Sequence, residues 1–569
     1  MDEARKTWLF LIPILLLTAA VYANALSFPF VYDDHNQIVS NPAIQAWQYI
    51  PRAFTAHVWN HKSSMAFYYR PIFMLWLMLN YQAFGLNPAG WHASTVALHL
   101  ICTYLVYRLA RRLTQREWVS LVAALLFGLY PAHVEAVDWV SGATEPLFAV
   151  FLLSSFLAYL AQRDATGMRH TRWRLASLLL AGLTVFSKET GVVMPPIVFA
   201  YEWFFHDATQ SRVDRIKAGM RAAFPYVLVV LVYAAVRTLA LKTFAHAMRS
   251  HSLLQILATW PAVIAFYIRH SILPVRLSVF YDLDFVSHLG IRNFVLPVLA
   301  ILVAGVAMYW FSQRSRTVAF LCAWMVLLTL PVLNLTIFGN GELVHDRYLY
   351  VVSAGLCILT AMLLASIPVR AARLAITGLL AGVYACGAVY EGHFWADGVS
   401  LNQRGLEIAP GNATATHNLG IELMLRQREA EAVPYFHQTL EREPRSEETL
   451  FALGLCYFDL NQNAESERYI KQALEVDPRD PKAHLFLGEI RARQGQLNEA
   501  EAEIRRAIAL LRVTGFKDYH RRLADVLARK NDLEGALREY RLELESNPDS
   551  AEAEQGLDEV RTRLRLAGK

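Results

Sequence analysis

Residues 413–480 read ATATHNLGIELMLRQREAEAVPYFHQTLEREPRSEETLFALGLCYFDLNQNAESERYIKQALEVDPRD, and the second half of this stretch repeats the pattern of the first. Leucine-glycine pairs and single prolines return every 34 residues here and in the segment that follows. The recurring residues are Leu419-Gly420, Leu453-Gly454 and Leu487-Gly488, with Pro410, Pro444 and Pro478. A fixed period of this length indicates stacked helix pairs that bury their apolar faces against one another.

A small residue at the helix crossing and a proline after the second helix are typical of the tetratricopeptide repeat. The period predicts units at 413–446, 447–480 and 481–514, and a fourth after a two-residue slip, so that the array covers about 413–550. Small residues in the second helices and their packing partners are Ala432, Ser466, Ala500 and Ala536 with Phe436, Ile470, Ile504 and Tyr540. Residues 551–569 are expected to form a charged capping helix. Such arrays have a concave groove, where we expect a protein or peptide to bind.

The rest of the chain has a different composition. Of residues 1–391, 47 are charged (about 12%), against 56 of residues 392–569 (about 31%). The first part is therefore expected to be a membrane domain, and residues 392–412 a connecting helix. The net charge of +5 divides into +11 before position 392 and −6 after it, which is no signature of a nucleic-acid partner.

Thirteen apolar segments are long enough to consider as membrane spans. They lie near 7–26, 70–86, 91–111, 117–131, 144–162, 174–187, 190–206, 222–241, 256–273, 293–312, 317–333, 348–366 and 373–391. The basic connections, for example Arg108 to Arg116, all fall on one side only if 70–86 and 256–273 lie at the outer face without crossing. The expected fold is all-α, a bundle of about eleven spans (thirteen at most) followed by the repeat solenoid. A cleavable signal peptide is the alternative interpretation of 7–26.

Either odd count places the two chain ends on opposite sides of the membrane. The positive-inside rule places the N-terminus in the cytoplasm, so we expect the repeats in a periplasm or lumen. We expect a multi-pass protein of the bacterial inner membrane, in contact with membrane lipid.

The outer loops of the eleven-span arrangement carry an unusual set of polar residues. Two adjacent carboxylates, Asp33 and Asp34, follow the first span, where they face water, a cation or a substrate, or cap a helix. The other outer-loop candidates are Arg70, His133, Glu135, Asp138, Lys188, Glu189, His345, Asp346 and Arg347. Lys188 and Glu189 could instead form a structural pair. Carboxylates and cations at one membrane face suit transfer of a group from a lipid-phosphate carrier to a hydroxyl: a carboxylate takes the proton, and cations hold the phosphate.

The order of short motifs resembles a known family. Five motifs precede the repeats: Tyr32-Asp33-Asp34, Tyr69-Arg70-Pro71, a His-Val-Glu-Ala-Val segment from His133, Ser187-Lys188-Glu189 and Asp346-Arg347-Tyr348. This order is similar to that of the transmembrane-and-tetratricopeptide-repeat O-mannosyltransferases. More broadly, the chain resembles the GT-C glycosyltransferases, which use polyprenyl-phosphate sugars. The resemblance implies that Asp33 or Asp34 is the catalytic carboxylate and that Arg70 contacts the donor phosphate. As cations of the same loops, Lys188 and Arg347 are expected to be further phosphate ligands. Ala143-Thr144, where relatives often carry Arg, and His345 depart from the family pattern.

The leading hypothesis is an inverting O-glycosyltransferase that moves a hexose or pentose to Ser or Thr of exported proteins held by the repeats. A ligase or oligosaccharyltransferase with a diphosphate-linked glycan is a second, with Asp33, Asp34, Glu135 and Asp138 as ligands of a divalent cation. A membrane-anchored repeat scaffold is a third, and a transporter a fourth. No metal site is indicated by residue spacing; a divalent cation stays open, and the lipid-phosphate sugar is the expected donor substrate.

Overall fold

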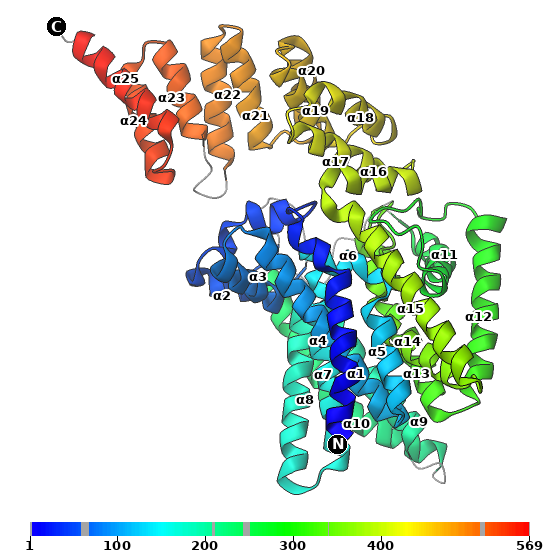
Figure 1. Cartoon of the computed structure of the whole chain (residues 1–569). Coiled ribbons are helices and arrows are strands. Elements are labelled where there is room, and N and C mark those ends of the chain that lie inside the picture. The colour runs from blue at the N-terminus through cyan, green and yellow to red at the C-terminus, as the bar shows by residue number, and fades with distance from the viewer. Residues whose placement is uncertain are drawn as a thin grey trace. The chain divides into compact units, whose positions relative to one another are not determined.

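The computed structural model describes residues 3–58, 68–206, 211–242, 251–339, 341–511 and 518–567. Within these ranges the chain forms helices and connecting loops, and no strand is present. The chain divides into two compact units, Met1–Asn412 and Ala413–Lys569 (Figure 1). The all-α fold expected from the sequence is confirmed, and each unit is described on its own below.

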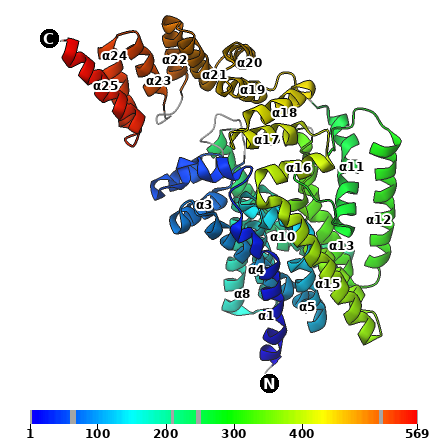
Figure 2. The same cartoon turned by 45° about the horizontal axis from the view of Figure 1, so that its top comes forward.

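The first unit is a bundle of long apolar helices that run roughly alongside one another (Figures 1 and 2). These helices are α1 (Glu3–Val21), α4 (Pro88–Thr114), α5 (Glu117–Gly128), α7 (Thr144–Asp164), α8 (Gly167–Ser187), α9 (Met194–Phe205), α10 (Arg212–Leu241), α12 (Leu296–Ser312), α13 (Arg316–Thr329), α14 (Val352–Ala365) and α15 (Arg370–Gly392). Further helices are α2 (Ile50–Thr55), α3 (Pro71–Phe84), α6 (Val134–Val137), α11 (Leu253–Ile272) and α16 (Gly398–Ile408).

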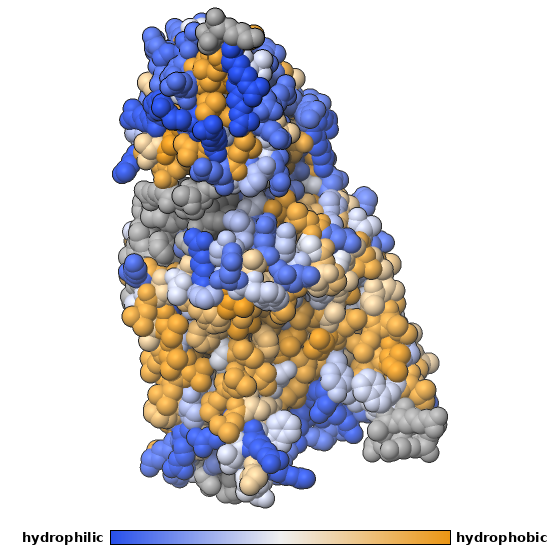
Figure 3. Space-filling model, turned by 90° about the vertical axis from the view of Figure 1, so that its left-hand side faces the viewer, coloured by the Kyte–Doolittle hydropathy of each residue, from blue (hydrophilic) through white to orange (hydrophobic). Residues whose placement is uncertain are grey.

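The helix starts follow local rules. Asn87 caps α4 by accepting a hydrogen bond from the Ala89 N–H at 3.2 Å, and Pro88 occupies the first turn, where its missing N–H costs nothing. On the face that Figure 3 shows, a broad hydrophobic band covers the middle of the bundle and hydrophilic residues gather at its lower end, as expected of a membrane protein.

By length and apolar composition, seven helices of the described residues can cross a membrane, or eight if α5 and the bent segment after it form one span. Among the seven is Leu253–Ile272, which we expected to stay at the outer face, whereas α3 at 14 residues is too short to count. Several of the eleven expected spans, α9 and α14 among them, are shorter than a full crossing. The chain is a multi-pass membrane protein, and the number of spans stays a prediction.

Short 3₁₀ turns carry the loops at one end of the bundle. Those used below are η5 (Pro131–His133), η6 (Val140–Ala143), η7 (Glu189–Val193), η11 (Asp346–Leu349) and η12 (His393–Ala396). Others are η1 (Ala23–Ser27), η3 (Pro42–Ile44), η4 (Trp47–Tyr49), η9 (Leu330–Leu333) and η10 (Leu335–Ile337), while η2 (His35–Val39) and η8 (Ile291–Val295) are π-helical.

The second unit consists of consecutive helix pairs and a final helix. The pairs are α17 (Ala413–Met424) with α18 (Glu429–Arg442), α19 (Glu447–Asp459) with α20 (Asn463–Val476), α21 (Pro481–Arg493) with α22 (Leu497–Leu510), and α23 (Tyr519–Arg529) with α24 (Leu533–Ser546), followed by α25 (Ala551–Ala567). The repeated glycines permit close helix crossings: a Cβ at Gly420 would lie 2.7 Å from the Phe436 ring, and one at Gly488 2.5 Å from Ile504.

Candidate active site

Asp34 is buried and joins two loops at one end of the bundle. Its Oδ1 accepts hydrogen bonds from the Ser141 N–H at 2.8 Å and the Ser141 hydroxyl at 2.5 Å, and its Oδ2 accepts one from the Val31 N–H at 3.2 Å. Although Asp34 precedes η2, its side chain makes no capping hydrogen bond to that helix. Burial raises the pKa of the Asp34 carboxyl to about 7, even though these hydrogen bonds lower it. Asp34 therefore fixes the loop and is not a helix cap.

Asp33 has a different environment from its neighbour. Its side chain is half-buried, whereas Asp34 is fully enclosed. The preceding residue, Tyr32, has a φ of 54°, in the left-handed region that bulky residues rarely adopt. The Tyr32 ring packs against Trp139 and Phe280, with centroids 5.5 and 5.9 Å away. A strained backbone held by aromatic packing thus presents Asp33 with partial access to solvent.

Arg70 pairs with Glu189 across 119 residues. Its Nε donates to Oε2 at 2.8 Å and its Nη2 to Oε1 at 2.5 Å, and the guanidinium lies over the Tyr68 ring. Burial would raise the pKa of the Glu189 carboxyl, but the Arg70 guanidinium lowers it to about 2. These two bonds use two of the five N–H groups of Arg70, so the guanidinium can still donate to a ligand.

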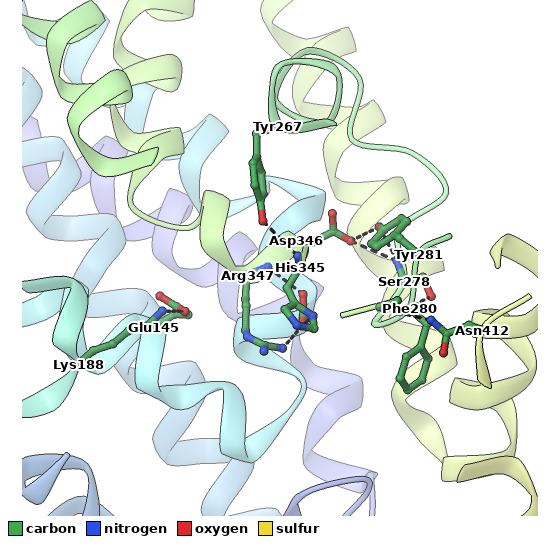
Figure 4. A network of polar contacts seen from close by, with 12 residues as sticks. Glu145, Lys188, Tyr267, Ser278, Phe280, Tyr281, His345, Asp346, Arg347 and Asn412 are labelled. Atoms are coloured by element: carbon green, nitrogen blue, oxygen red, sulfur yellow. Dashed lines mark hydrogen bonds and ion pairs between the residues drawn. The ribbon is translucent and has the colours of Figure 1, made fainter. Parts of the chain in front are cut away.

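Lys188 does not pair with Glu189, the partner that the sequence suggested. Its Nζ forms a buried ion pair with Glu145 and lies 4.7 Å from the centre of the Tyr348 ring (Figure 4). The extended backbone of Lys188, with φ −154°, sends the two neighbouring side chains to different partners. The structural pair proposed as the alternative for Lys188 and Glu189 is therefore absent.

Arg347 pairs with Glu135. The guanidinium contacts Glu135 Oε1, and the Arg347 N–H donates to Oε2 at 2.9 Å. The Arg347 guanidinium also lies over the Trp139 ring, 5.2 Å from its centre. His345 Nδ1 lies 3.6 Å from Glu135 Oε1, and the His345 N–H donates to the Tyr267 hydroxyl at 3.2 Å. Burial lowers the pKa of the His345 imidazole well below its usual value, so the ring is neutral at pH 7.

Asp346 faces away from Arg347. Its Oδ2 accepts hydrogen bonds from the Tyr281 hydroxyl at 2.5 Å and the Ser278 N–H at 3.2 Å, so the carboxyl anchors the loop after α11 (Figure 4). Its Oδ1 is buried without a hydrogen-bond partner, and burial raises the pKa of this carboxyl well above its usual value.

Two of the candidate residues lie apart from these ion pairs. His133 is fully buried among aromatic rings, and its Nε2 lies 2.8 Å from the Ser353 hydroxyl. Asp138 is also buried, and a Cβ at Gly392 would lie 2.5 Å from its Oδ2, so it points at the end of α15. The structure therefore brings the Asp34, Arg70, Lys188, Glu189, Glu135, His345 and Arg347 side chains into cross-loop contacts, and it places His133 and Asp138 in interior packing.

The contacts between loops constrain the path of the chain. The loop after α1 bonds the loop after α5 through Asp34 and Ser141, and the loop after α8 bonds the residue before α3 through Glu189 and Arg70. At the far end of α10, the Tyr233 hydroxyl donates to the Tyr69 carbonyl at 3.2 Å, beside Arg70. Tyr267, near the end of α11, contacts the same site through His345. The C-terminal end of α10 and the C-terminal end of α11 therefore both lie at the site. This favours an α11 that does not cross the membrane, as the eleven-span arrangement expects.

Sequence reasoning missed several partners. Ser141, Tyr281 and Ser278 hold the site loops by hydrogen bonds, and Glu145 neutralises Lys188. Ser and Tyr in loops carry no spacing signal, so only the folded structure identifies them. In the described part of the chain, no group of three or more His, Cys, Asp or Glu side chains is arranged to hold a metal ion.

The arrangement places cations and carboxylates at one end of an apolar bundle. Arg70, Lys188 and Arg347 each have a carboxylate neighbour and an aromatic ring beside them. Such preorganised cations can bind a phosphate group, and the half-buried Asp33 carboxylate can accept a proton.

Comparisons with known proteins agree with the resemblance. A family model described as "Tetratricopeptide repeat" matches residues 451–512. Protein O-mannosyl-transferase F38B6.6 of Caenorhabditis elegans is 24% identical over 427 residues, which cover 72% of this chain and 59% of that protein. Protein O-mannosyl-transferase TMTC3 of Mus musculus is 25% identical over 493 residues (79% and 52%), and TMTC2 of Mus musculus is 31% identical over 208 residues (35% and 24%).

The resemblance expected from the sequence is thus confirmed: the chain is homologous to proteins named as O-mannosyl-transferases over most of its length. The repeat prediction is confirmed as well. The chain spans somewhat more than half the length of the first two curated relatives that it matches.

Proposed function

We propose that this chain is a membrane glycosyltransferase that moves a single sugar from a polyprenyl-phosphate donor to Ser or Thr hydroxyls of exported proteins. The relatives are named protein O-mannosyl-transferases, so mannose is the first sugar to test. The observation that carries the proposal is a set of shared aromatic contacts. Tyr32, the neighbour of the half-buried Asp33, packs against Trp139, and the Arg347 guanidinium lies over the same ring. Arg347 and Lys188 both lie over the Tyr348 ring.

The residues divide the chemistry among them. Asp33 takes the proton of the acceptor hydroxyl while the hydroxyl oxygen attacks the anomeric carbon of the sugar. The bond from that carbon to the phosphate oxygen breaks, and its electron pair leaves with the lipid phosphate. Arg70 and Arg347 donate hydrogen bonds to the phosphate and stabilise its growing charge, with Lys188 as a third cation. Attack opposite the leaving group inverts the anomeric centre.

Asp34 supports this step without touching the substrate. Its bonds to Ser141 hold the loop that carries Asp33 against the loop that carries Glu135 and Trp139. Removing Asp34 would therefore affect the position of Asp33 and the folding of the site, and would not remove the base.

The topology follows from the same proposal. The N-terminus lies in the cytoplasm of a bacterial cell, and the site and the repeats face the periplasm, where the lipid-linked donor and exported acceptors meet. The groove of the repeats binds the acceptor protein. Its donor is a lipid-phosphate sugar, and no further cofactor is proposed.

Mass spectrometry of exported proteins from cells with and without this chain tests the proposal. We expect hexose-sized additions on Ser or Thr that disappear with the chain and return with the wild-type gene, but not with Asp33→Asn. Unchanged modification in cells that lack the chain contradicts the proposal. Loss of transfer on chelation would favour the diphosphate-linked alternative.

A further inference from the structure

The segment that follows α15 contacts the loops of the site. This connector, residues 392–412, contains η12 and α16 and lies within the first compact unit. Arg404, on α16, donates from Nη2 to both carboxylate oxygens of Glu391, at 3.0 and 3.2 Å. The Glu391 side chain is 6% exposed and that of Arg404 11% exposed, so the pair is buried.

Glu391 extends the contact to the loop after α11. Its Oε1 also accepts a hydrogen bond from the Leu277 N–H at 3.2 Å. The next residue, Ser278, donates its N–H to Asp346, which receives the Tyr281 hydroxyl as well. Asp346 is the direct neighbour of Arg347 in the 3₁₀ turn η11. A continuous set of hydrogen bonds therefore joins Arg404 to the turn that carries Arg347.

A small cavity of about 20 Å³ lies along this path. Glu135, Asp346, Glu391 and Arg404 all line it, together with apolar residues of η5, η12 and α16. Asp346 Oδ1 and Arg404 Nε are both buried without hydrogen-bond partners. A cavity of this size holds about one water, so the connector and the site loops meet at a small gap lined by both charged and apolar side chains.

A second contact fixes the far end of the connector. Asn412 Nδ2 donates to the Gly341 carbonyl at 3.0 Å, in the loop that leads to His345. Gly341 has a φ of +73°, and a Cβ there would lie 2.5 Å from Asn412 Nδ2, so only glycine permits this approach. The connector therefore contacts the 341–349 loop directly through Asn412, and its Arg404 reaches the same loop by way of Glu391, Leu277-Ser278 and Asp346.

We propose that Glu391 and Arg404 are positioning residues that hold Arg347 in place for the donor phosphate, so that the connector is a working part of the site. This inference rests on the proposed function. It follows that a substitution in the connector, such as one at Arg404, alters donor use, although neither Glu391 nor Arg404 touches the donor.

The test compares two arginine–glutamate pairs with buried carboxylates in the full chain; the Arg163 side chain is 32% exposed and that of Arg404 11%. Arg404→Gln breaks the pair at the connector. Arg163→Gln breaks the Arg163–Glu202 pair, which has the same 3.0 Å separation and a glutamate 7% exposed, but joins α7 and α9 away from the site. Both variants remove the arginine partner of a buried glutamate, so both should lower the melting temperature; Glu202 keeps His206 and Tyr159 as neighbours.

Two readouts separate positioning from stability. We expect Arg404→Gln to raise the KM for the polyprenyl-phosphate sugar about tenfold, with a smaller rise in Arg404→Lys, and Arg163→Gln to leave it unchanged, because a displaced phosphate ligand loses alignment. Hydrogen exchange of the 277–281 and 343–349 peptides should accelerate in Arg404→Gln alone.

The outcomes are distinct. If Arg404→Gln and Arg163→Gln change melting temperature, exchange and KM alike, the pair is only structural and the inference is wrong. A second outcome is that hydrogen exchange of the site loops accelerates in Arg404→Gln, but the wild type does not transfer sugar from a polyprenyl-phosphate donor. In that case the positioning contact is real and the proposed function is wrong.

Discussion

Asp34 Oδ1 accepts two hydrogen bonds from a single residue, Ser141, which lies 107 positions later in the chain. The two adjacent aspartates therefore have different roles in the structure. Asp34 is committed to joining two loops, and the half-buried Asp33 is the carboxylate that a substrate can approach.

The Asp34–Ser141 contact should show as a coupling in stability. Ser141→Ala and Asp34→Asn should each lower stability by about 1–3 kcal/mol, since each leaves a buried polar group with a poorer partner. The double variant should be less destabilised than the sum of the two, which thermal melting in detergent measures. Strict additivity would mean that the two residues are not coupled.

The stability of the chain should depend on pH through Asp34. Because the folded-state pKa of Asp34 is raised from 3.8 to about 7, the folded chain holds a proton in this range that the unfolded chain releases. Its contribution to stability is full below pH 4 and is lost as pH rises through 7. The melting temperature of the wild type should therefore fall more between pH 5 and pH 8 than that of Asp34→Asn. An identical fall in both chains would contradict a raised pKa for this carboxyl.

Arg70 and Arg347 should govern donor use. Replacement of either by Ala should reduce kcat/KM for the lipid-phosphate donor about 10- to 100-fold, the range expected for a lost charge-assisted hydrogen bond. Kinetics at varied donor concentration give this ratio, and Arg52→Ala, at an exposed position on α2, is the matched control. In Arg70→Ala alone, the Glu189 carboxylate loses its partner; the double variant Arg70→Ala with Glu189→Gln removes that negative charge as well. If that variant recovers donor use, Arg70 serves only to neutralise Glu189.

The repeats should fold without the membrane unit. Residues 413–569 form their own compact unit, so the fragment should be soluble and helical by circular dichroism. Gly488→Val should destabilise it by about 1–3 kcal/mol, because the added side chain meets Ile504 at the helix crossing. Gly495→Ala, at a position with nothing within 4 Å but a positive φ, isolates backbone strain from packing. An equal effect of both changes would argue against the crossing.

The period of 34 residues predicted the repeats because each glycine and its packing partner lie in one unit, as Gly420 and Phe436 do. The side of the membrane on which the loops lie stays a prediction, which rests on the positive charges of the opposite connections. Both the repeat period and the charge pattern are local features of the sequence, so they can be recognised without the folded structure.

Pairings between loops were not predictable. Lys188 and Glu189 are neighbours, but their directions depend on the extended backbone at Lys188 and on the positions of Glu145 and Arg70. His133 was a site candidate on its place in a loop, yet the turn η5 directs it to Ser353. Glu391 and Arg404 gave no signal in the sequence, because one buried pair has no period.

In the proposed reaction, Asp33 is the general base. The most direct test is transfer from a defined polyprenyl-phosphate mannose to a Ser/Thr peptide by purified wild type, Asp33→Asn and Asp34→Asn, with equal folding shown by thermal melting. Loss of a general base typically costs about 10²- to 10⁴-fold in rate, so Asp33→Asn should lose that much kcat with an unchanged donor KM, and Asp34→Asn less. Transfer by Asp33→Asn at the wild-type rate would contradict the account.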